Sequence, residues 1–326
     1  MDTSQQHKLN RRGIGWFLLI AFGGAWLLAL PMWLDPRGLN SSWAGLILAM
    51  NFTPTVATLI VTRWISPLPH VRQATGLRRG VRGSRWGRYW LFGWLAMPLF
   101  MIAAPFVGAL FGLFPLDLQQ FSGLRAWAQA SPQGAALLAR VPPAVYAWTV
   151  VLTLPLQALL LTPFTFGEEW GWRGYLLPQL LPLGQARALL VSGVIWGLWH
   201  APVVLLGFNY PLHPPLVGLL LMVIFSTIMG TLLGWTRLAT GSVWPAVLGH
   251  AGMDSNQVLG GVLLLTRAGA VIDTAHVLIG WTGWILPLLC IALLVLTRRL
   301  PVRSAPDLVP APEPEGRPTG ATPSQV

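Results

Sequence analysis

The chain has 326 residues, of which 54% are hydrophobic and only 10% are charged, and its mean hydropathy is +0.60. An ordinary soluble domain carries roughly 25% charged residues, so this composition excludes one and indicates a membrane protein. The formal net charge is +11, but the basic residues stand between apolar stretches rather than in one continuous patch. We therefore expect the lipid bilayer, and no nucleic acid, among the partners. A single cysteine, Cys290, excludes an intrachain disulfide.

Eight apolar stretches reach about the 20 residues that a helix needs to cross a bilayer. We place the predicted spans at 13–34, 43–62, 89–114, 144–177, 187–208, 214–236, 242–265 and 276–297. The expected fold class is therefore all-α, a polytopic membrane protein with about eight transmembrane helices. Residues 1–297 form one integral membrane domain in this interpretation. The remaining segment, 298–326, is rich in Pro, Ala and Glu and is predicted to be a disordered tail.

Positive charge is concentrated on every second connection between these spans, which predicts the orientation of the chain. The connection 63–88 carries seven arginines and no acidic residue. Basic residues also precede the first span and follow the fourth, sixth and eighth. Positive charge marks the cytoplasmic side, so both termini and the tail are expected to be cytoplasmic. The arginines of 63–88 are read as this topology signal, and a patch that holds anionic lipid headgroups is the alternative.

Two adjacent glutamates, Glu168 and Glu169, interrupt the fourth apolar stretch and are followed by Arg173. A carboxylate in the hydrocarbon layer is costly, so it is rare there unless it has a partner or a task. On a helix, Glu169 and Arg173 share a face and are predicted to form an ion pair. Glu168 lies about 100° away and stays free, which makes it the candidate reactive carboxylate. The alternative is a structural pair with a spare glutamate.

Histidines occur in two further apolar stretches. His200 follows Trp196 by four residues, so the indole is expected to pack against the imidazole. Gly193 and Gly197 permit the close approach of another helix. His250 and Asp254 are also four residues apart, so the carboxylate can orient the imidazole or share a ligand with it. Counting 1.5 Å per residue places Glu168, His200 and His250 at comparable depths. We expect them to line one cavity that opens toward the cytoplasm.

At these residues the chain resembles the CAAX prenyl protease and bacteriocin-processing family of intramembrane proteases, also called the Abi family. The family pattern is Glu-Glu-x-x-x-Arg, then Phe-x-x-x-His, then His-x-x-x-Asn or Asp, on successive membrane helices. The resemblance covers about residues 144–256, which would hold the catalytic core. Two positions depart from the common pattern: Trp196 replaces the usual Phe, and Asp254 stands where many members carry Asn.

The resemblance implies an intramembrane endopeptidase that hydrolyses a peptide bond in a membrane-associated protein or peptide. The residues it implies as catalytic are Glu168, Glu169, Arg173, His200, His250 and Asp254. By analogy Glu168 activates water with the support of His200, and His250 with Asp254 stabilises the oxyanion. The same resemblance leaves two mechanisms open. Glu168, His200, His250 and Asp254 could bind Zn²⁺, which Asp254 favours because it enlarges the ligand set, or the same groups could act without a metal.

Two other classes of protein remain as alternatives. A transporter or channel could use buried Glu and His as a proton relay, but it would be expected to show an internal repeat, and the sequence shows none. A catalytically silent family member could serve as a membrane scaffold or as a bacteriocin-immunity protein.

The chain has 20 Arg and one Lys, a bias typical of a GC-rich prokaryote, so we expect a multi-pass protein of a prokaryotic plasma (inner) membrane. A bacteriocin-like peptide or a membrane-anchored regulator is the expected substrate, and the sequence leaves the oligomeric state open.

Overall fold

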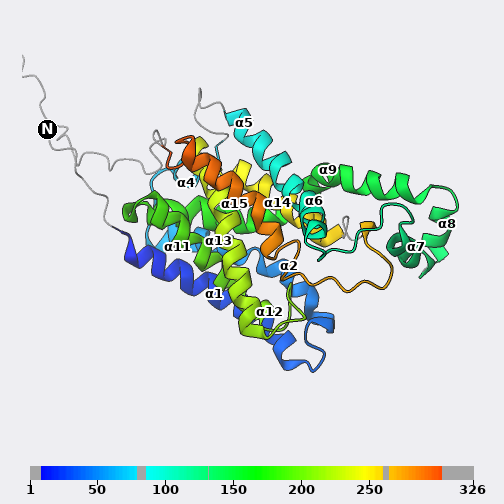
Figure 1. Ribbon diagram of the computed structural model, residues 1–326. Helices are drawn as coiled ribbons and strands as arrows, with labels where there is room; N and C mark the ends of the chain where they lie inside the picture. Colours follow the sequence, from blue (N-terminus) through cyan, green and yellow to red (C-terminus); the bar gives the residue numbers. More distant parts are fainter. Residues whose placement is uncertain (1–8, 79–85, 131, 260–263, 303–326) are drawn as a thin grey trace, which may run out of the picture.

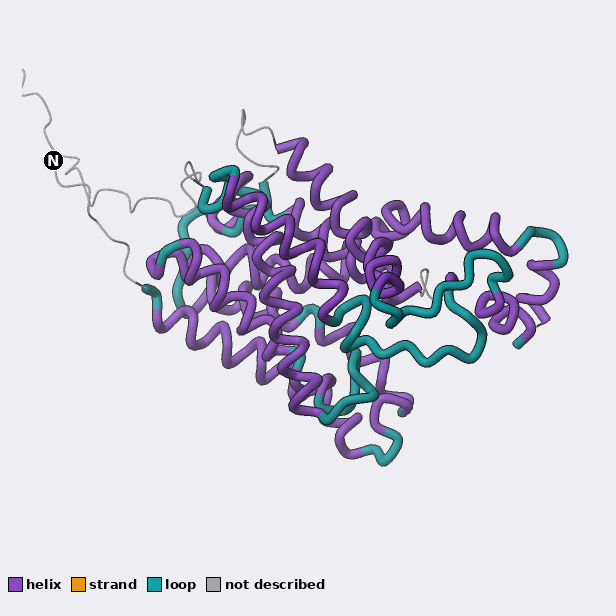
Figure 2. The backbone as a smooth tube through the Cα atoms, viewed as in Figure 1, coloured by secondary structure: helices purple, strands orange, loops and turns teal. Residues whose placement is uncertain are grey.

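The computed structural model describes residues 9–78, 86–130, 132–259 and 264–302. Within these ranges the chain folds into helices joined by loops, without a strand (Figure 2). One isolated bridge joins Leu116 and Thr266. The predicted all-α class is confirmed. The predicted disorder of the tail falls almost wholly on residues outside the described ranges, and so do Arg79, Arg82 and Arg85 of the basic connection.

The helices follow one another in the order shown in Figure 1. The α-helices are α1 (Arg11–Leu34), α2 (Leu46–Met50), α3 (Thr53–Ile60), α4 (Val71–Ala74), α5 (Trp86–Leu91), α6 (Met97–Leu110), α7 (Ser122–Gln129), α8 (Pro132–Leu138), α9 (Pro143–Glu169), α10 (Leu177–Leu180), α11 (Gln185–Trp199), α12 (Ala201–Val204), α13 (Pro215–Thr240), α14 (Trp244–Leu259) and α15 (Trp281–Leu296). Three π-helical segments continue these helices at Val61–Ile65, Phe92–Ala96 and Trp170–Leu176.

Four helical stretches in the described ranges are long and apolar enough to cross a membrane: Arg11–Leu34, Trp86–Leu110, Pro143–Leu183 and Pro215–Thr240. A fifth is obtained if the pair Ser42–Met50 and Thr53–Ile65, bent by 42°, counts as one broken span. These helices support a membrane location. The count of eight spans stays a prediction, because α11, α14 and α15 have only 15, 16 and 16 residues. The cytoplasmic placement of both termini also stays a prediction.

The predicted span 187–208 is wrong in its second half. The helix α11 ends at Trp199, and the short α12 begins again at Ala201. Pro202 explains the break, because a proline disfavours helical backbone at the residue before it and lacks an N–H for the helical ladder. His200 consequently lies at the end of a helix rather than in its middle.

Recognisable caps fix two of the long helices. The Asn10 side chain accepts a hydrogen bond from the Gly13 N–H at 2.9 Å, which caps the start of α1. At the end of α13, Gly241 takes a left-handed conformation with φ of 68° and its N–H donates to the Arg237 carbonyl. These caps set where α1 begins and where the chain turns from α13 into α14.

Alternate connections meet at opposite ends of the helical bundle. At one end Trp244 Nε1, at the start of α14, donates to the Leu77 carbonyl, and Trp235 Nε1 in α13 donates to the Arg299 carbonyl, both at 3.1 Å. At the other end Trp33 Nε1 donates to the Pro202 carbonyl at 2.7 Å. We call the first the arginine-bearing end. This alternation agrees with the arginine pattern in the sequence.

Close contact between α11 and α13 depends on two glycines. A Cβ atom at Gly193 would lie 2.6 Å from Thr227 Cα, and one at Gly197 would lie 2.5 Å from Val223 Cα. Any larger residue would push the two helices apart. The close approach predicted from this small-residue step is therefore confirmed, with α13 as the partner helix.

A buried arginine ties the arginine-bearing end together. Arg237 in α13 is fully buried, and its Nε donates to the Arg173 carbonyl at 3.1 Å while Nη2 donates to the Ala74 carbonyl at 3.0 Å. No carboxylate pairs with it among the described residues. Gly76 has a φ of 74°, and a Cβ there would lie 2.7 Å from Arg237 Cζ. The basic connection is thus held against the bundle by carbonyl groups around one guanidinium.

We predict that Gly76→Ala lowers the thermal stability of the purified protein more than Gly38→Ala. Both glycines have positive φ, so each substitution costs about 1–2 kcal/mol of backbone strain. Only the Gly76 methyl group meets Arg237, whereas nothing lies within 4 Å at Gly38. The extra overlap should add about 1–3 kcal/mol. Thermal unfolding in detergent measures both variants, and equal midpoints would show that the Arg237 contact is not tight.

Candidate active site

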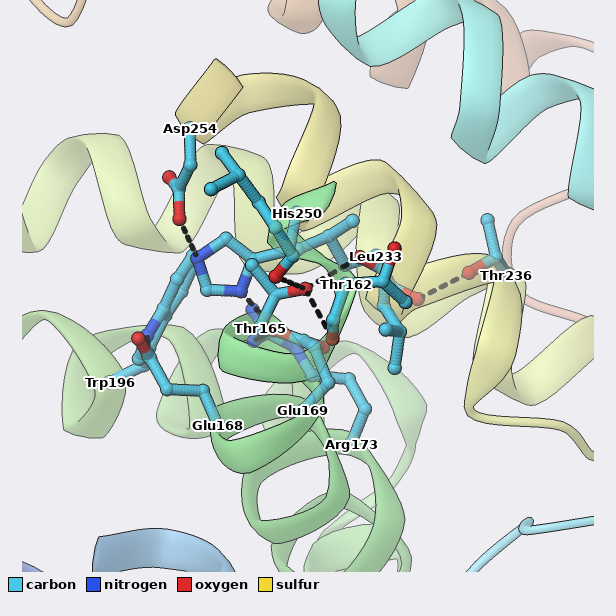
Figure 3. A network of polar contacts seen from close by, with 12 residues as sticks. Thr162, Thr165, Glu168, Glu169, Arg173, Trp196, Leu233, Thr236, His250 and Asp254 are labelled. Atoms are coloured by element: carbon cyan, nitrogen blue, oxygen red, sulfur yellow. Dashed lines mark hydrogen bonds and ion pairs between the residues drawn. The ribbon is translucent and has the colours of Figure 1, made fainter. Parts of the chain in front are cut away.

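The six residues singled out in the sequence come from three helices and one π-helical segment. Glu168 and Glu169 end α9, and Arg173 lies in the following segment Trp170–Leu176. His200 caps the end of α11, while His250 and Asp254 lie on α14. Figure 3 shows the His250 ring between Asp254 on one side and Glu169 with Arg173 on the other, and it shows Glu168 beside Trp196. A cavity of about 150 Å³ is lined by Glu168, His200, His250 and Asp254.

Glu169 and Arg173 lie behind this cavity and form a buried ion pair. Their side chains are 0% and 1% exposed, and Arg173 Nη1 lies 2.5 Å from Glu169 Oε1. The same oxygen accepts a hydrogen bond from His250 Nδ1 at 2.9 Å. The predicted pairing of Glu169 with Arg173 is confirmed. The sequence did not indicate that His250, 81 residues later, would join the pair.

Glu168 faces the cavity and is not part of that ion pair. Its Oε2 accepts a hydrogen bond from Trp196 Nε1 at 2.7 Å, and the residue is 4% exposed. An N–H donor fixes one carboxylate oxygen and leaves the other able to accept a proton. The indole of Trp196 therefore holds Glu168 in one orientation, a role that we had not predicted for it.

Trp196 contacts four of the six residues. Besides Glu168, its ring lies under the Arg173 guanidinium, with Cζ 4.1 Å from the ring centroid, which is a cation–π arrangement. The His250 ring packs against it in a T-shaped arrangement, with the ring centroids 5.1 Å apart. The Trp196 carbonyl lies 2.8 Å from His200 Nδ1. A single residue thus joins the carboxylate, both imidazoles and the guanidinium.

The hydrogen bonds fix how both imidazoles are oriented. A carbonyl oxygen can only accept, so His200 Nδ1 carries the proton and Nε2 keeps its lone pair. His250 Nδ1 likewise donates to the Glu169 carboxylate, and its Nε2 lies 3.4 Å from Asp254 Oδ2. That separation exceeds an ordinary N–H···O hydrogen bond. The predicted pairing of His250 with Asp254 is present, but it is loose.

The expected zinc ligands do not form a metal-binding cluster. Both imidazoles have Nδ1 held by an acceptor, as metal-ligating histidines do. Within the part of the chain that the structure describes, however, no three carboxylate, imidazole or thiol groups come close enough to hold a metal ion. One Glu168 oxygen accepts the Trp196 N–H, and the other oxygen has no hydrogen-bond partner among the described residues. The arrangement does not fit Zn²⁺, and the zinc site stays a prediction from the resemblance.

Two asparagines that the sequence analysis passed over also line the cavity. Asn51 lies at the break between α2 and α3, and Asn209 lies in the loop after α12 with a φ of 67°. The Asn209 amide lies 3.9 Å from Met222 Sδ, a weak acceptor, and among the described residues no hydrogen bond reaches the Asn51 amide. The signal for Asn51 is in the sequence, because an Asn and Pro54 interrupt an otherwise apolar stretch.

The walls of the cavity come mainly from the end opposite the arginines. Phe208 and Asn209 belong to the connection after α12, and Ile47 and Leu48 belong to α2. Both elements lie toward the end where Trp33 contacts Pro202. The expected opening toward the arginine-bearing end therefore gains no support from the lining residues.

Comparison with known proteins adds a family to this geometry. Residues 143–255 match the model of the family described as Type II CAAX prenyl endopeptidase Rce1-like. The resemblance of the three motifs to this family is confirmed. The chain is also similar to CAAX prenyl protease 2 of Methanococcus maripaludis, with 30% identity over 126 residues that cover 37% of this chain and 45% of that protein. The chain thus matches less than half the length of that relative. All six residues lie inside the matched segment.

We predict that Arg173→Met destabilises the protein strongly. The substitution leaves the buried Glu169 carboxylate without its main partner, and breaking a buried ion pair in this way costs about 3–5 kcal/mol. Thermal unfolding in detergent measures the effect. Arg37→Met is the matched control, because the Arg37–Asp35 pair has an arginine side chain that is 62% exposed, and no measurable change is expected. Adding Glu169→Gln to Arg173→Met should recover part of the lost stability, and a further loss would contradict the explanation.

Proposed function

We propose that the protein is an intramembrane endopeptidase that hydrolyses a peptide bond in a membrane-associated protein or peptide. The observation that carries this proposal is the Glu168 carboxylate, which is held by Trp196 at a small cavity shared with two imidazoles and a second carboxylate. The match of the surrounding segment to CAAX endopeptidases supports it. A prokaryotic plasma membrane is the proposed location.

In the proposed reaction Glu168 is the general base. Its free oxygen takes a proton from a water molecule, whose oxygen attacks the carbonyl carbon of the scissile bond. His200 Nε2 accepts the second hydrogen of that water and holds it in line for attack. When the tetrahedral intermediate collapses, the C–N bond breaks and the protonated Glu168 returns its proton to the leaving amine. The carboxylate is regenerated, so the cycle is balanced without another acid.

His250 is the proposed donor to the oxyanion. Glu169 fixes its Nδ1, and the loose contact with Asp254 at 3.4 Å leaves Nε2–H available to a substrate oxygen. An ionised Asp254 cannot donate a hydrogen bond itself, so its role is to favour the protonated imidazole. Arg173 keeps Glu169 ionised and oriented. These assignments follow the roles implied by the family resemblance.

The size of the cavity limits what the enzyme can hold at the reacting centre. A volume of about 150 Å³ corresponds to about five water molecules at roughly 30 Å³ each. It accommodates a short piece of an extended peptide with one apolar side chain rather than a folded domain. Asn51 and Asn209 offer amides that can both donate to and accept from a peptide backbone. We propose that they align the substrate strand.

The experiment that tests the function is cleavage of a library of membrane-anchored peptides by the purified protein. Glu168→Gln keeps the shape of the side chain and its contact with Trp196 but removes the base. We expect the rate to fall at least about 10²-fold to 10⁴-fold. Unchanged cleavage in this variant would exclude the proposed mechanism. If a cellular phenotype survives in Glu168→Gln and no cleavage is found in any preparation, the scaffold or immunity alternative replaces the enzyme.

The same assay, run with and without a chelator, tests the metal. The donor arrangement leads us to expect cleavage to continue after dialysis against a strong chelator. Loss of activity on chelation, restored by stoichiometric Zn²⁺, would show that the ligands rearrange around an ion and would reinstate the zinc prediction. Metal analysis of the active protein is the independent readout.

Trp196→Phe should lower kcat about tenfold to a hundredfold with little change in KM. The substitution restores the residue common in the family and keeps an aromatic wall, but it removes the N–H that holds Glu168, a bond to a charged group worth about 1.5–3 kcal/mol. Trp199→Phe is the control on the same helix, because its Nε1 donates only to Thr53 Oγ1 at 3.2 Å. We expect it to change kcat less than threefold. Equal effects of the two substitutions would show that the Glu168 contact is not used in the reaction.

A further inference from the structure

A second and larger cavity lies at the arginine-bearing end of the bundle. Its volume is about 720 Å³, and it lies between the start of α11, the middle of α13 and the end of α15. Its walls are mostly apolar, and they include Leu183, Leu189, Leu190, Val295, Leu300 and Val302. It shares no lining residue with the catalytic cavity. Arg187 at this groove and His200 are 13 residues apart on α11 and its C-cap, which corresponds to about 20 Å along a helix.

Polar contacts of the chain after α15 hold this groove in shape. Gln185 Nε2 donates to the Val302 carbonyl at 2.9 Å, and the Val302 N–H donates to Gln185 Oε1 at 2.8 Å. Trp235 Nε1 donates to the Arg299 carbonyl at 3.1 Å. The segment Leu300–Val302 is thus fixed as a wall at a set distance from α11. The groove is therefore bounded on this side by a segment that hydrogen bonds hold in place.

The mouth of the groove is positively charged. Arg187 lines it, and Arg298 and Arg299 directly precede the lining residue Leu300. All three side chains are exposed, and within the described ranges none has an ion-pair or hydrogen-bond partner. The segments 183–190 and 295–302 contain no acidic residue. Arginine pairs bidentately with phosphate oxygens, so this mouth is suited to a phosphate-bearing group.

The surface around the groove indicates that its occupant comes from the bilayer. Leu190 is 54% exposed, and Leu296 on the last turn of α15 is 80% exposed. In a membrane protein such leucines face lipid chains. The volume lies within the roughly 300–1,000 Å³ of pockets that enclose small organic ligands. An apolar slot with a cationic mouth at one end of a membrane bundle matches an acyl chain joined to an anionic headgroup.

We propose that this groove binds an anionic phospholipid. One acyl chain lies between α11, α13 and the Leu300–Val302 segment, and Arg187 with the neighbouring arginines binds the headgroup phosphate. The site is independent of the proposed peptidase activity, because it uses none of the residues of the catalytic cavity. The full-length protein binds the lipid whether or not it cleaves a peptide.

The test compares two lipids with identical acyl chains on the delipidated, detergent-purified full chain. Phosphatidylglycerol is the anionic probe and phosphatidylcholine the zwitterionic one, and binding is read by native mass spectrometry and by the shift in thermal unfolding. We expect phosphatidylglycerol to bind more tightly and to raise the unfolding midpoint further. Arg187→Gln should weaken phosphatidylglycerol binding about fivefold and phosphatidylcholine binding less, because the phosphate of phosphatidylcholine is already neutralised by its own choline cation. Arg140→Gln, an exposed arginine at the other end, is the matched control and should change neither.

A bulky side chain in the groove should abolish the binding of both lipids. Leu190→Trp places a bulky side chain inside it, and Thr231→Leu fills it from α13, so one variant suffices if the other does not fold. Leu198→Trp is the control on α11, because Leu198 is 40% exposed and lies outside the groove. The proposal is overturned if the two lipids bind equally to the wild-type protein, if Arg187→Gln and Arg140→Gln have the same effect, or if both filled variants bind phosphatidylglycerol normally. Stabilisation by inorganic phosphate alone, equal to that by the lipid, also overturns it.

Discussion

The hydrogen bond from Trp196 to Glu168 is the interaction on which the rest of the site depends. It ties the end of α9 to the last turn of α11, and through the same residue α11 also contacts α14 and the π-helical segment that carries Arg173. Buried carboxylates are costly unless they are paired or hydrogen-bonded. Glu169 Oε1 contacts both Arg173 and His250, whereas Glu168 has one neutral donor. The two neighbours in sequence therefore have different chemistry, with one structural and one available for reaction.

The charged residues that position the site are distinct from the residues that line the cavity. Arg173, Glu169 and His250 form a chain of contacts behind the cavity, and this chain fixes the imidazole without using the face that lines the cavity. Side chains on rigid elements and supported from behind lose little entropy when a substrate arrives. The residues in contact with the cavity are then free to change partners during a reaction, as the loose His250–Asp254 contact illustrates.

What could be predicted from the sequence follows from the geometry of a single helix. The pairs Glu169–Arg173 and His250–Asp254 were predictable because a spacing of four residues places side chains on one face. The link between Glu169 and His250 and the donation from Trp196 to Glu168 were not, since they depend on how helices rotate and approach one another. An indole in an apolar stretch indicates only packing against its neighbours. The role of its N–H as a donor becomes visible only when the structure places a carboxylate within hydrogen-bonding distance. The break at His200 was visible in Pro202 and was overlooked because the apolar stretch continues beyond it.

Arg237 has a consequence for how the protein is made. Glu169 can pair with Arg173 inside one helix as soon as that helix forms, so this charge is neutralised locally. Arg237 has no such neighbour, and both of its carbonyl acceptors, on Ala74 and Arg173, lie far earlier in the chain. Since synthesis proceeds from the N-terminus, both acceptors already exist when α13 leaves the ribosome. The order of the residues thus lets Arg237 reach carbonyl acceptors on segments that are made before it, and a circular permutation that placed α13 first would deprive it of those acceptors during insertion.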